Sequence, residues 1–121
     1  MSAPNPAPAA GSDDPCHSSA EELAAAVPAP PTVEEAVRLA KGFADPTRLR
    51  ILAMLRLGEV CVHQIVDTLE MEQSAVSHQL RTLRAARLVE HTKRGRHVYY
   101  RLADAHVLAM LEGILSHSRE V

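Results

Sequence analysis

Residues 73–84 read QSAVSHQLRTLR, and this stretch decides the fold class. Its apolar residues, among them Val76, Leu80 and Leu83, recur at helical spacing and predict a helix from about residue 73 to about residue 87. A shorter helix is predicted over residues 61–69, so only a tight turn joins the two. The outer face of the second helix is polar and basic. Such a pair is typical of a helix-turn-helix, whose later helix can enter a DNA major groove.

The residues that follow, 88–102, read LVEHTKRGRHVYYRL. Their β-branched and aromatic side chains favour two strands, and Gly95 between them permits a tight turn, so a β-hairpin is predicted. Three cations lie at its tip, Lys93, Arg94 and Arg96, where they can contact phosphate or a minor groove. The hairpin is interpreted as a wing. The predicted fold is therefore mainly α with a small β-hairpin, a winged helix-turn-helix.

Further helices are predicted on both sides of this motif. Thr32 is a candidate N-cap for a helix that ends near Phe43, and Asp45 followed by Pro46 is a second helix start signal. Gly58 ends that second helix, and a last helix starts at about residue 104.

The N-terminal part of the chain differs from the rest in composition. Residues 1–31 are rich in Pro, Ala, Ser and Asp, which predicts a flexible N-terminal extension, apart from a candidate short helix over residues 20–26. At 121 residues the chain is long enough for one domain and too short for two. We therefore expect a single folded domain over residues 32–121.

The formal net charge of −2 hides a split along the chain. Residues 1–36 contain six acidic residues and no Lys or Arg. Residues 73–101 contain seven basic residues against Glu90 alone. This local excess of positive charge is typical of a phosphate-binding face.

Targeting signals and a disulfide framework are not evident in the sequence. The chain contains no apolar run of about 18 residues, and its start lacks the pattern of a signal peptide, so a cytosolic protein is expected. Of the two cysteines, Cys16 lies in the extension and Cys61 in the domain. We expect both to be reduced thiols with roles in packing or metal binding.

The helix-turn-helix and the wing together resemble the ArsR/SmtB family of bacterial metal-sensing repressors, and most closely its zinc-responsive SmtB-like members. The resemblance covers roughly residues 33–120 and implies a winged-helix homodimer. Such a dimer represses metal-efflux or metal-sequestration genes and leaves its operator when metal binds. The motifs that carry the resemblance are ADPTRLR at 44–50, EVCV at 59–62, QSAVSHQL at 73–80 and GRHVYY at 95–100.

The resemblance implies a metal site on the C-terminal helix made of Asp104, His106, His117 and Glu120. With a rise of about 1.5 Å per residue, His106 and His117 lie about 16 Å apart along one helix, so one chain cannot close the site. Their spacing is close to three whole turns, so an antiparallel pairing with the same helix of a second chain brings them together. Each of two symmetric sites would take two ligands from each subunit, a set suited to Zn²⁺ and also to Co²⁺.

A second metal site is implied by family members that use cysteines of the helix before the recognition helix together with the N-terminal extension. Here Cys61 matches, Cys16 and His17 could reach it from the extension, and His63 is a further candidate ligand. A thiolate would favour softer ions such as Cd²⁺ or Pb²⁺, besides Zn²⁺. The sequence departs from the family where a second Cys or an Asp is often found, and a lone Cys on a helix is commonly a small buried hydrophobe.

The predicted partner is double-stranded operator DNA. Because a dimer has two-fold symmetry, we expect an imperfect inverted repeat with half-sites about one helical turn apart. Metal bound across the dimer interface would fix the two helix-turn-helix motifs in a relative orientation that fits successive major grooves poorly. The residues predicted to face DNA are Ser74, Ser77, His78, Gln79 and Arg81 on the recognition helix, and Lys93, Arg94 and Arg96 in the wing, with Arg48 as a weaker candidate.

Other interpretations remain open at this point. Asp104 could serve only as an N-cap, His106 as a surface residue and His117 as a cation favourable at a helix C-terminus. The nearest alternative function is a winged-helix regulator that senses soft metals or redox state through Cys61 and the extension. A metal buffer would leave the basic helix and wing unexplained. An enzyme is not expected, because four protein ligands in so small a chain leave neither an open zinc position nor a substrate pocket.

Overall fold

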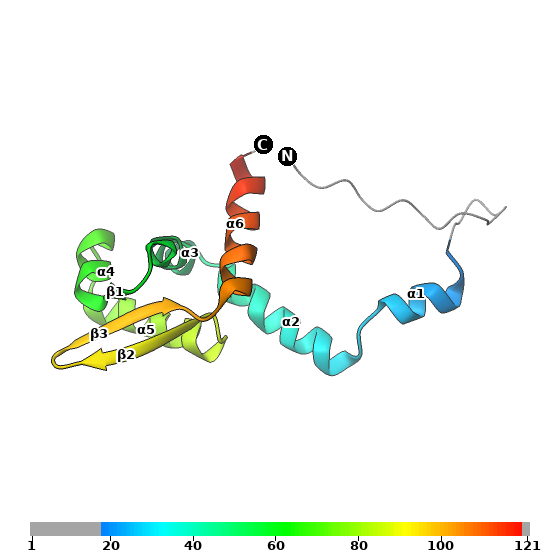
Figure 1. Cartoon of the computed structure of the whole chain (residues 1–121), viewed down its shortest axis with the longest axis horizontal. Coiled ribbons are helices and arrows are strands. Elements are labelled where there is room, and N and C mark those ends of the chain that lie inside the picture. Colours follow the sequence, from blue (N-terminus) through cyan, green and yellow to red (C-terminus); the bar gives the residue numbers. More distant parts are fainter. Residues whose placement is uncertain (1–17, 120–121) are drawn as a thin grey trace.

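The structure is a computed structural model that describes residues 18–119. The predicted ligands Cys16, His17 and Glu120 lie outside these residues. Figure 1 shows α6 rising from the end of the wing beside α2, with α1 set apart from the other elements. In chain order the elements are α1 (Ala20–Ala26), α2 (Pro30–Phe43), α3 (Pro46–Met54), the 3₁₀ helix η1 (Leu55–Leu57), β1 (Val60–Cys61), α4 (Val62–Leu69), α5 (Gln73–Ala85), β2 (Val89–Arg94), β3 (His97–Leu102) and α6 (Ala105–Arg119).

Local start signals explain most of the helix N-termini. In α3, Asp45 is the N-cap, its Oδ2 accepts a hydrogen bond from the backbone N–H of Arg48 at 3.0 Å, and Pro46 occupies the first turn, as predicted. Helix α1 is present over the predicted residues and begins with a capping box of Ser19 and Glu22.

The prediction that Thr32 caps the next helix is wrong. Helix α2 starts three residues earlier, with Ala29 as its N-cap and prolines in its first turn. Proline has no N–H to leave unpaired there and its φ is already close to helical, so Pro30 and Pro31 favour the earlier start. The expected domain boundary between residues 31 and 32 therefore falls inside α2.

The helix-turn-helix is confirmed, with two adjustments of its boundaries. Helix α4 begins at Val62 rather than Cys61, because Cys61 is extended and pairs with Tyr99 in a short strand that the sequence did not indicate. Helix α5 ends at Ala85 rather than near Arg87. The backbone of Arg87 is left-handed (φ +61°), and the N–H of Leu88 bonds back to the carbonyl of Leu83 at 3.0 Å, which turns the chain into β2.

The predicted wing is also confirmed. Strands β2 and β3 form an antiparallel hairpin, and β1 pairs with the other edge of β3, so the order is β1-β3-β2. The turn places Gly95 at φ +61°, a conformation that glycine adopts without steric cost.

One hydrophobic core joins the C-terminal end of α2 with α3, α4, α5, α6 and the sheet. Helix α5 contributes Val76, Leu80 and Leu83 from one face, each at most 1% exposed. Every residue of α1 is exposed, so this helix adds nothing to the core. Within residues 18–119, no helix is both long and apolar enough to cross a membrane.

Candidate nucleic-acid interface and metal-binding helix

The recognition helix α5 has one buried face and one solvent face. Because Val76, Leu80 and Leu83 are buried, the residues at the other helical positions point outward. Ser74, His78 and Arg81 are exposed, and Ser77 is half-buried. The face predicted to contact DNA is thus accessible over most of its length.

Arg48 and Gln79 are both half-buried, and their side chains contact each other. Arg48 donates from Nη1 to Gln79 Oε1 at 3.0 Å, from Nε to the carbonyl of Gly42 at 3.0 Å and from Nη2 to the carbonyl of Lys41 at 2.8 Å. These carbonyls lie in the last turn of α2, where the helix dipole favours a cation. Arg48 therefore ties α2 to the recognition helix.

The two faces of the wing differ in the charges they carry. Successive strand residues point to opposite faces, so Lys93 and Arg94 lie on different sides of the hairpin. Lys93 pairs across the strands with Val98, and we call the face with Lys93, Val98 and Tyr100 the front face. It looks toward α4 and α5 across a hollow of about 170 Å³ lined by Val62, His63, Gln73, Ser77, Leu80, Arg96, Val98 and Tyr100.

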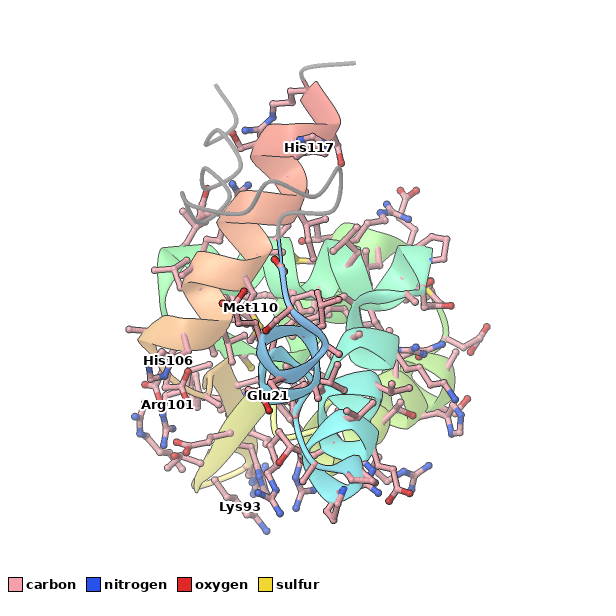
Figure 2. The ribbon with its side chains drawn as sticks, turned by 90° about the vertical axis from the view of Figure 1, so that its right-hand side faces the viewer. Glu21, Lys93, Arg101, His106, Met110 and His117 are labelled. Atoms are coloured by element: carbon pink, nitrogen blue, oxygen red, sulfur yellow. The ribbon has the colours of Figure 1, made fainter. Side chains whose placement is uncertain are left out.

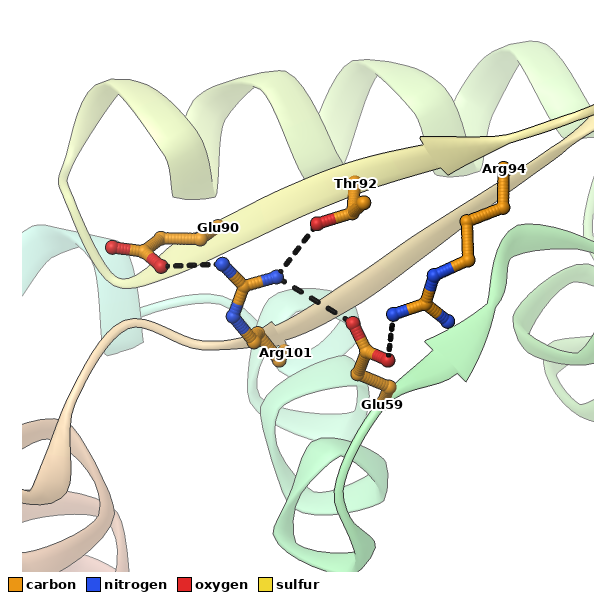
Figure 3. A network of polar contacts seen from close by, with 5 residues as sticks. All are labelled: Glu59, Glu90, Thr92, Arg94 and Arg101. Carbon is orange, nitrogen blue, oxygen red and sulfur yellow. Dashed lines mark hydrogen bonds and ion pairs between the residues drawn. The ribbon is translucent and has the colours of Figure 1, made fainter.

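The opposite face, which we call the back face, comprises Glu90, Thr92, Arg94, His97, Tyr99 and Arg101. Figure 3 shows its polar network. Arg94 Nη2 lies 2.6 Å from Glu59 Oε1, and Arg101 Nη1 lies 3.5 Å from Glu59 Oε2. Arg101 also contacts Glu90 Oε2 at 2.8 Å and Thr92 Oγ1 at 2.9 Å. Glu59 belongs to the EVCV motif at 59–62, but no local pattern indicates its partners.

Cys61 lies beside a histidine that the sequence analysis did not select. Its Sγ atom is 3.7 Å from Nδ1 of His97, and the rings of His97 and His63 meet edge to face with centroids 5.5 Å apart. Cys61 is only 8% exposed. The pairing of β1 with β3 brings these residues together, and no local pattern indicates it.

The predicted ligands of the C-terminal helix lie at opposite ends of α6. Figure 2 shows His106 near the base of this helix and His117 near its top. Asp104 does act as a cap, since its Oδ1 accepts the N–H of Val107 at 3.0 Å, and the same oxygen lies 3.7 Å from Nδ1 of His106. The His106 side chain is 93% exposed. Within the part of the chain that the structure describes, no three His, Cys, Asp or Glu residues are grouped so that they could hold a metal ion.

Helices α2 and α6 enclose an apolar groove of about 570 Å³. It is lined by Ala36, Leu39, Ala40, Phe43, Ala109, Met110, Gly113, Ile114 and His117. Other apolar residues of the two helices remain exposed nearby, including Val33, Val37 and Leu108. Exposed apolar surface of this kind is typical of interaction sites.

Known bacterial regulatory proteins are similar to this chain in sequence. The family described as bacterial regulatory protein, arsR family, matches residues 45–91. A transcriptional repressor SmtB homolog from Synechocystis sp. is 41% identical over 92 residues, which cover 74% of this chain and 70% of the relative. A cadmium resistance transcriptional regulatory protein CadC homolog from Staphylococcus aureus is 35% identical over 88 residues, which cover 72% of this chain and 73% of the relative.

A solved structure is similar over most of the chain. The solution NMR structure of a homodimeric winged helix-turn-helix DNA-binding domain from Mycobacterium bovis superposes with a TM-score of 0.70 at 27% identity. The match covers 87% of this chain and 91% of that domain.

Proposed function

The chain belongs to the arsR family of bacterial regulatory proteins, and from this premise we propose that it is a homodimeric repressor that releases operator DNA when zinc binds between its subunits. Its relatives are transcriptional regulators, so the chain is a regulator and not an enzyme. The relatives named above include one described by cadmium resistance, which supports a divalent metal as the signal in general. Zinc in particular is our proposal.

The observation that carries the proposal is the layout of α6. Asp104 and His106 lie at one end and His117 lies in the last turn of a single continuous helix. A rise of about 1.5 Å per residue keeps the two histidines about 16 Å apart, so these ligands are useful together only if a second chain supplies the missing half. The apolar groove between α2 and α6 gives that second chain a surface to cover.

The donor set fits zinc by its chemistry. Each shared site would combine Asp104 and His106 of one subunit with the partner subunit's His117 and the partner subunit's Glu120, giving two imidazole nitrogens and two carboxylate oxygens. Zn²⁺ accepts both donor types in tetrahedral sites. Asp104 can cap α6 through Oδ1 and still offer its other carboxylate oxygen. The bound ion would supply a cross-link between subunits, while the residues set its position.

The DNA-binding half of the proposal rests on α5 and the front face of the wing. Exposed Ser74, His78 and Arg81 would meet base edges and phosphates in the major groove, with Ser77 and the amide of Gln79 beside them. Lys93 and Arg96 would contact the backbone with little sequence information. Two-fold symmetry of the dimer would require an imperfect inverted repeat.

Metal binding and DNA binding would be linked through the relative orientation of the two recognition helices of the dimer. If zinc lowers the affinity for operator by some factor, operator must lower the affinity for zinc by the same factor. If competition titrations show no such reciprocity, zinc does not regulate operator binding, even if the protein binds both zinc and operator.

The test is a zinc titration of the protein bound to a fluorescent duplex that it selects from a random pool. We expect zinc to release the wild-type protein and a variant with Cys61→Ser and His63→Ala. We expect the variant with His106→Ala and His117→Ala to stay bound. If zinc releases both variants, the α6 site is rejected as the sensor. The same holds if zinc releases none of the three proteins.

A second candidate signal is supported by the contact of Cys61 with His97. A thiol 3.7 Å from an imidazole nitrogen offers one sulfur and one nitrogen donor to a soft ion such as Cd²⁺ or Pb²⁺, or a thiol for oxidation. Cys16 and His17 could complete this site from the extension. In the titration above, release by Cd²⁺ of the wild type but not of the Cys61→Ser, His63→Ala variant would favour this candidate.

A further inference from the structure

The structure separates the three cations of the wing tip by their surroundings. Lys93 is on the front face and Arg96 borders the hollow beside α5, whereas Arg94 is on the back face against Glu59. We propose that Glu59 is a positioning residue that withholds Arg94 from the DNA backbone and so limits the sequence-independent affinity of the wing. The inference rests on the proposed function, because it requires a wing that lies against DNA phosphate.

The guanidinium group of Arg94 makes two contacts. Nη2 lies 2.6 Å from Glu59 Oε1, a short charge-assisted hydrogen bond. The Cζ atom lies over the Tyr99 ring, 4.9 Å from its centre, which is a cation–π contact. The Arg94 side chain is nevertheless 56% exposed, so its restraint comes from these two contacts and not from burial.

Glu59 is itself fixed by a second arginine. Its Oε1 faces Arg94, and its Oε2 lies 3.5 Å from Nη1 of Arg101. Arg101 does not depend on Glu59, because it also bonds to Glu90 at 2.8 Å and to Thr92 at 2.9 Å. Loss of the Glu59 carboxylate would therefore remove the ion pair of Arg94 and leave it only the contact with Tyr99, whereas Arg101 would keep Glu90 and Thr92. Figure 3 shows these polar contacts.

Counterion release gives this arrangement a measurable consequence. Each phosphate neutralised by a free cation adds about 0.9 to the steepness of log K against log salt on duplex DNA. If Arg94 moves from Glu59 to a phosphate, the DNA loses a counterion but Glu59 gains one, so the net salt effect nearly cancels. An Arg94 without a carboxylate partner would contribute its full share.

The experiment compares the wild type with Glu59→Gln and with Glu90→Gln by fluorescence anisotropy. The probe is a random-sequence duplex of about 30 base pairs, titrated between about 50 and 200 mM salt. We expect Glu59→Gln to steepen the salt dependence by about 0.9 and to tighten binding roughly fivefold at the lowest salt. Glu90→Gln removes the same charge from the same face but releases no cation, so it controls for the general loss of negative charge and should change the slope far less.

A double variant identifies the cation responsible. In an Arg94→Gln background, the added substitution Glu59→Gln should no longer steepen the slope. The inference is overturned if Glu59→Gln matches Glu90→Gln, weakens binding, or retains its gain without Arg94. If the wild type fails to bind the duplex at all, the proposed function fails as well; if the wild type binds and only the Glu59 comparison fails, the proposed function stands.

Discussion

Replacement of Arg48 by lysine distinguishes a structural clamp from a DNA contact. The sequence places Arg48 among the weaker candidates for phosphate binding, and lysine would keep the charge needed for that role. In the structure, Arg48 makes three hydrogen bonds, two to the last turn of α2 and one to Gln79 of α5. A lysine ammonium is compact and lacks the rigid fork of donors, so it can replace only one of them.

The size of the effect follows from the number of bonds lost. A hydrogen bond to a charged group contributes about 1.5–3 kcal/mol when well protected, and we take about 1 kcal/mol for each of these because Arg48 is half-exposed. The loss of two bonds predicts that Arg48→Lys lowers the free energy of unfolding by about 2 kcal/mol. In a domain of this size, such a loss corresponds to a fall of roughly 10 °C in Tm.

Urea unfolding followed by circular dichroism measures this difference. All proteins are compared at one concentration, because the stability of a dimer depends on it. Arg50→Lys, an exposed position on the same helix α3, is the matched control and should change stability by less than about 0.5 kcal/mol. If Arg48→Lys is as stable as Arg50→Lys, the clamp has no energetic role and the reasoning is refuted.

Three further predictions concern packing and DNA contact. An added Cβ at Gly42 would lie 2.4 Å from Cδ1 of the fully buried Leu88. Gly42→Ala should therefore lower the free energy of unfolding in urea by about 1–2 kcal/mol, although alanine has the better helix propensity. A stabilised variant would contradict this packing. Ile65→Ala, at a position 0% exposed, should lower the unfolding free energy by about 2–5 kcal/mol in the same assay, and a loss below about 1 kcal/mol would show that α4 is not part of the core. Lys93→Gln should flatten the salt dependence of duplex binding by about 0.9, whereas an unchanged slope would remove the front face of the wing from the DNA interface.

Short-range signals determined the order of elements and much of the candidate interface. The start of α3 follows from Asp45 and Pro46, which act on the first turn of their own helix. The buried face of α5 follows from the spacing of Val76, Leu80 and Leu83, and the wing turn from Gly95. Each depends on residues within a few positions of one another, so the sequence suffices. The prediction that Thr32 caps α2 was wrong because of another local signal. The two prolines before Thr32 favour an earlier helix start more strongly.

Contacts between distant residues were decided only by the tertiary structure. Arg48 reaches Gln79 across 31 positions, Glu59 reaches Arg94 across 35, and Cys61 approaches His97 across 36. Periodicity identifies which face of a strand a residue occupies, but not which element lies opposite that face. For this reason the sequence predicted the same role for Lys93, Arg94 and Arg96 at the wing tip, whereas the packing of the hairpin against its neighbours gave these cations different surroundings. The metal ligands on α6 remain a prediction from the sequence, because a complete metal site would need a second chain.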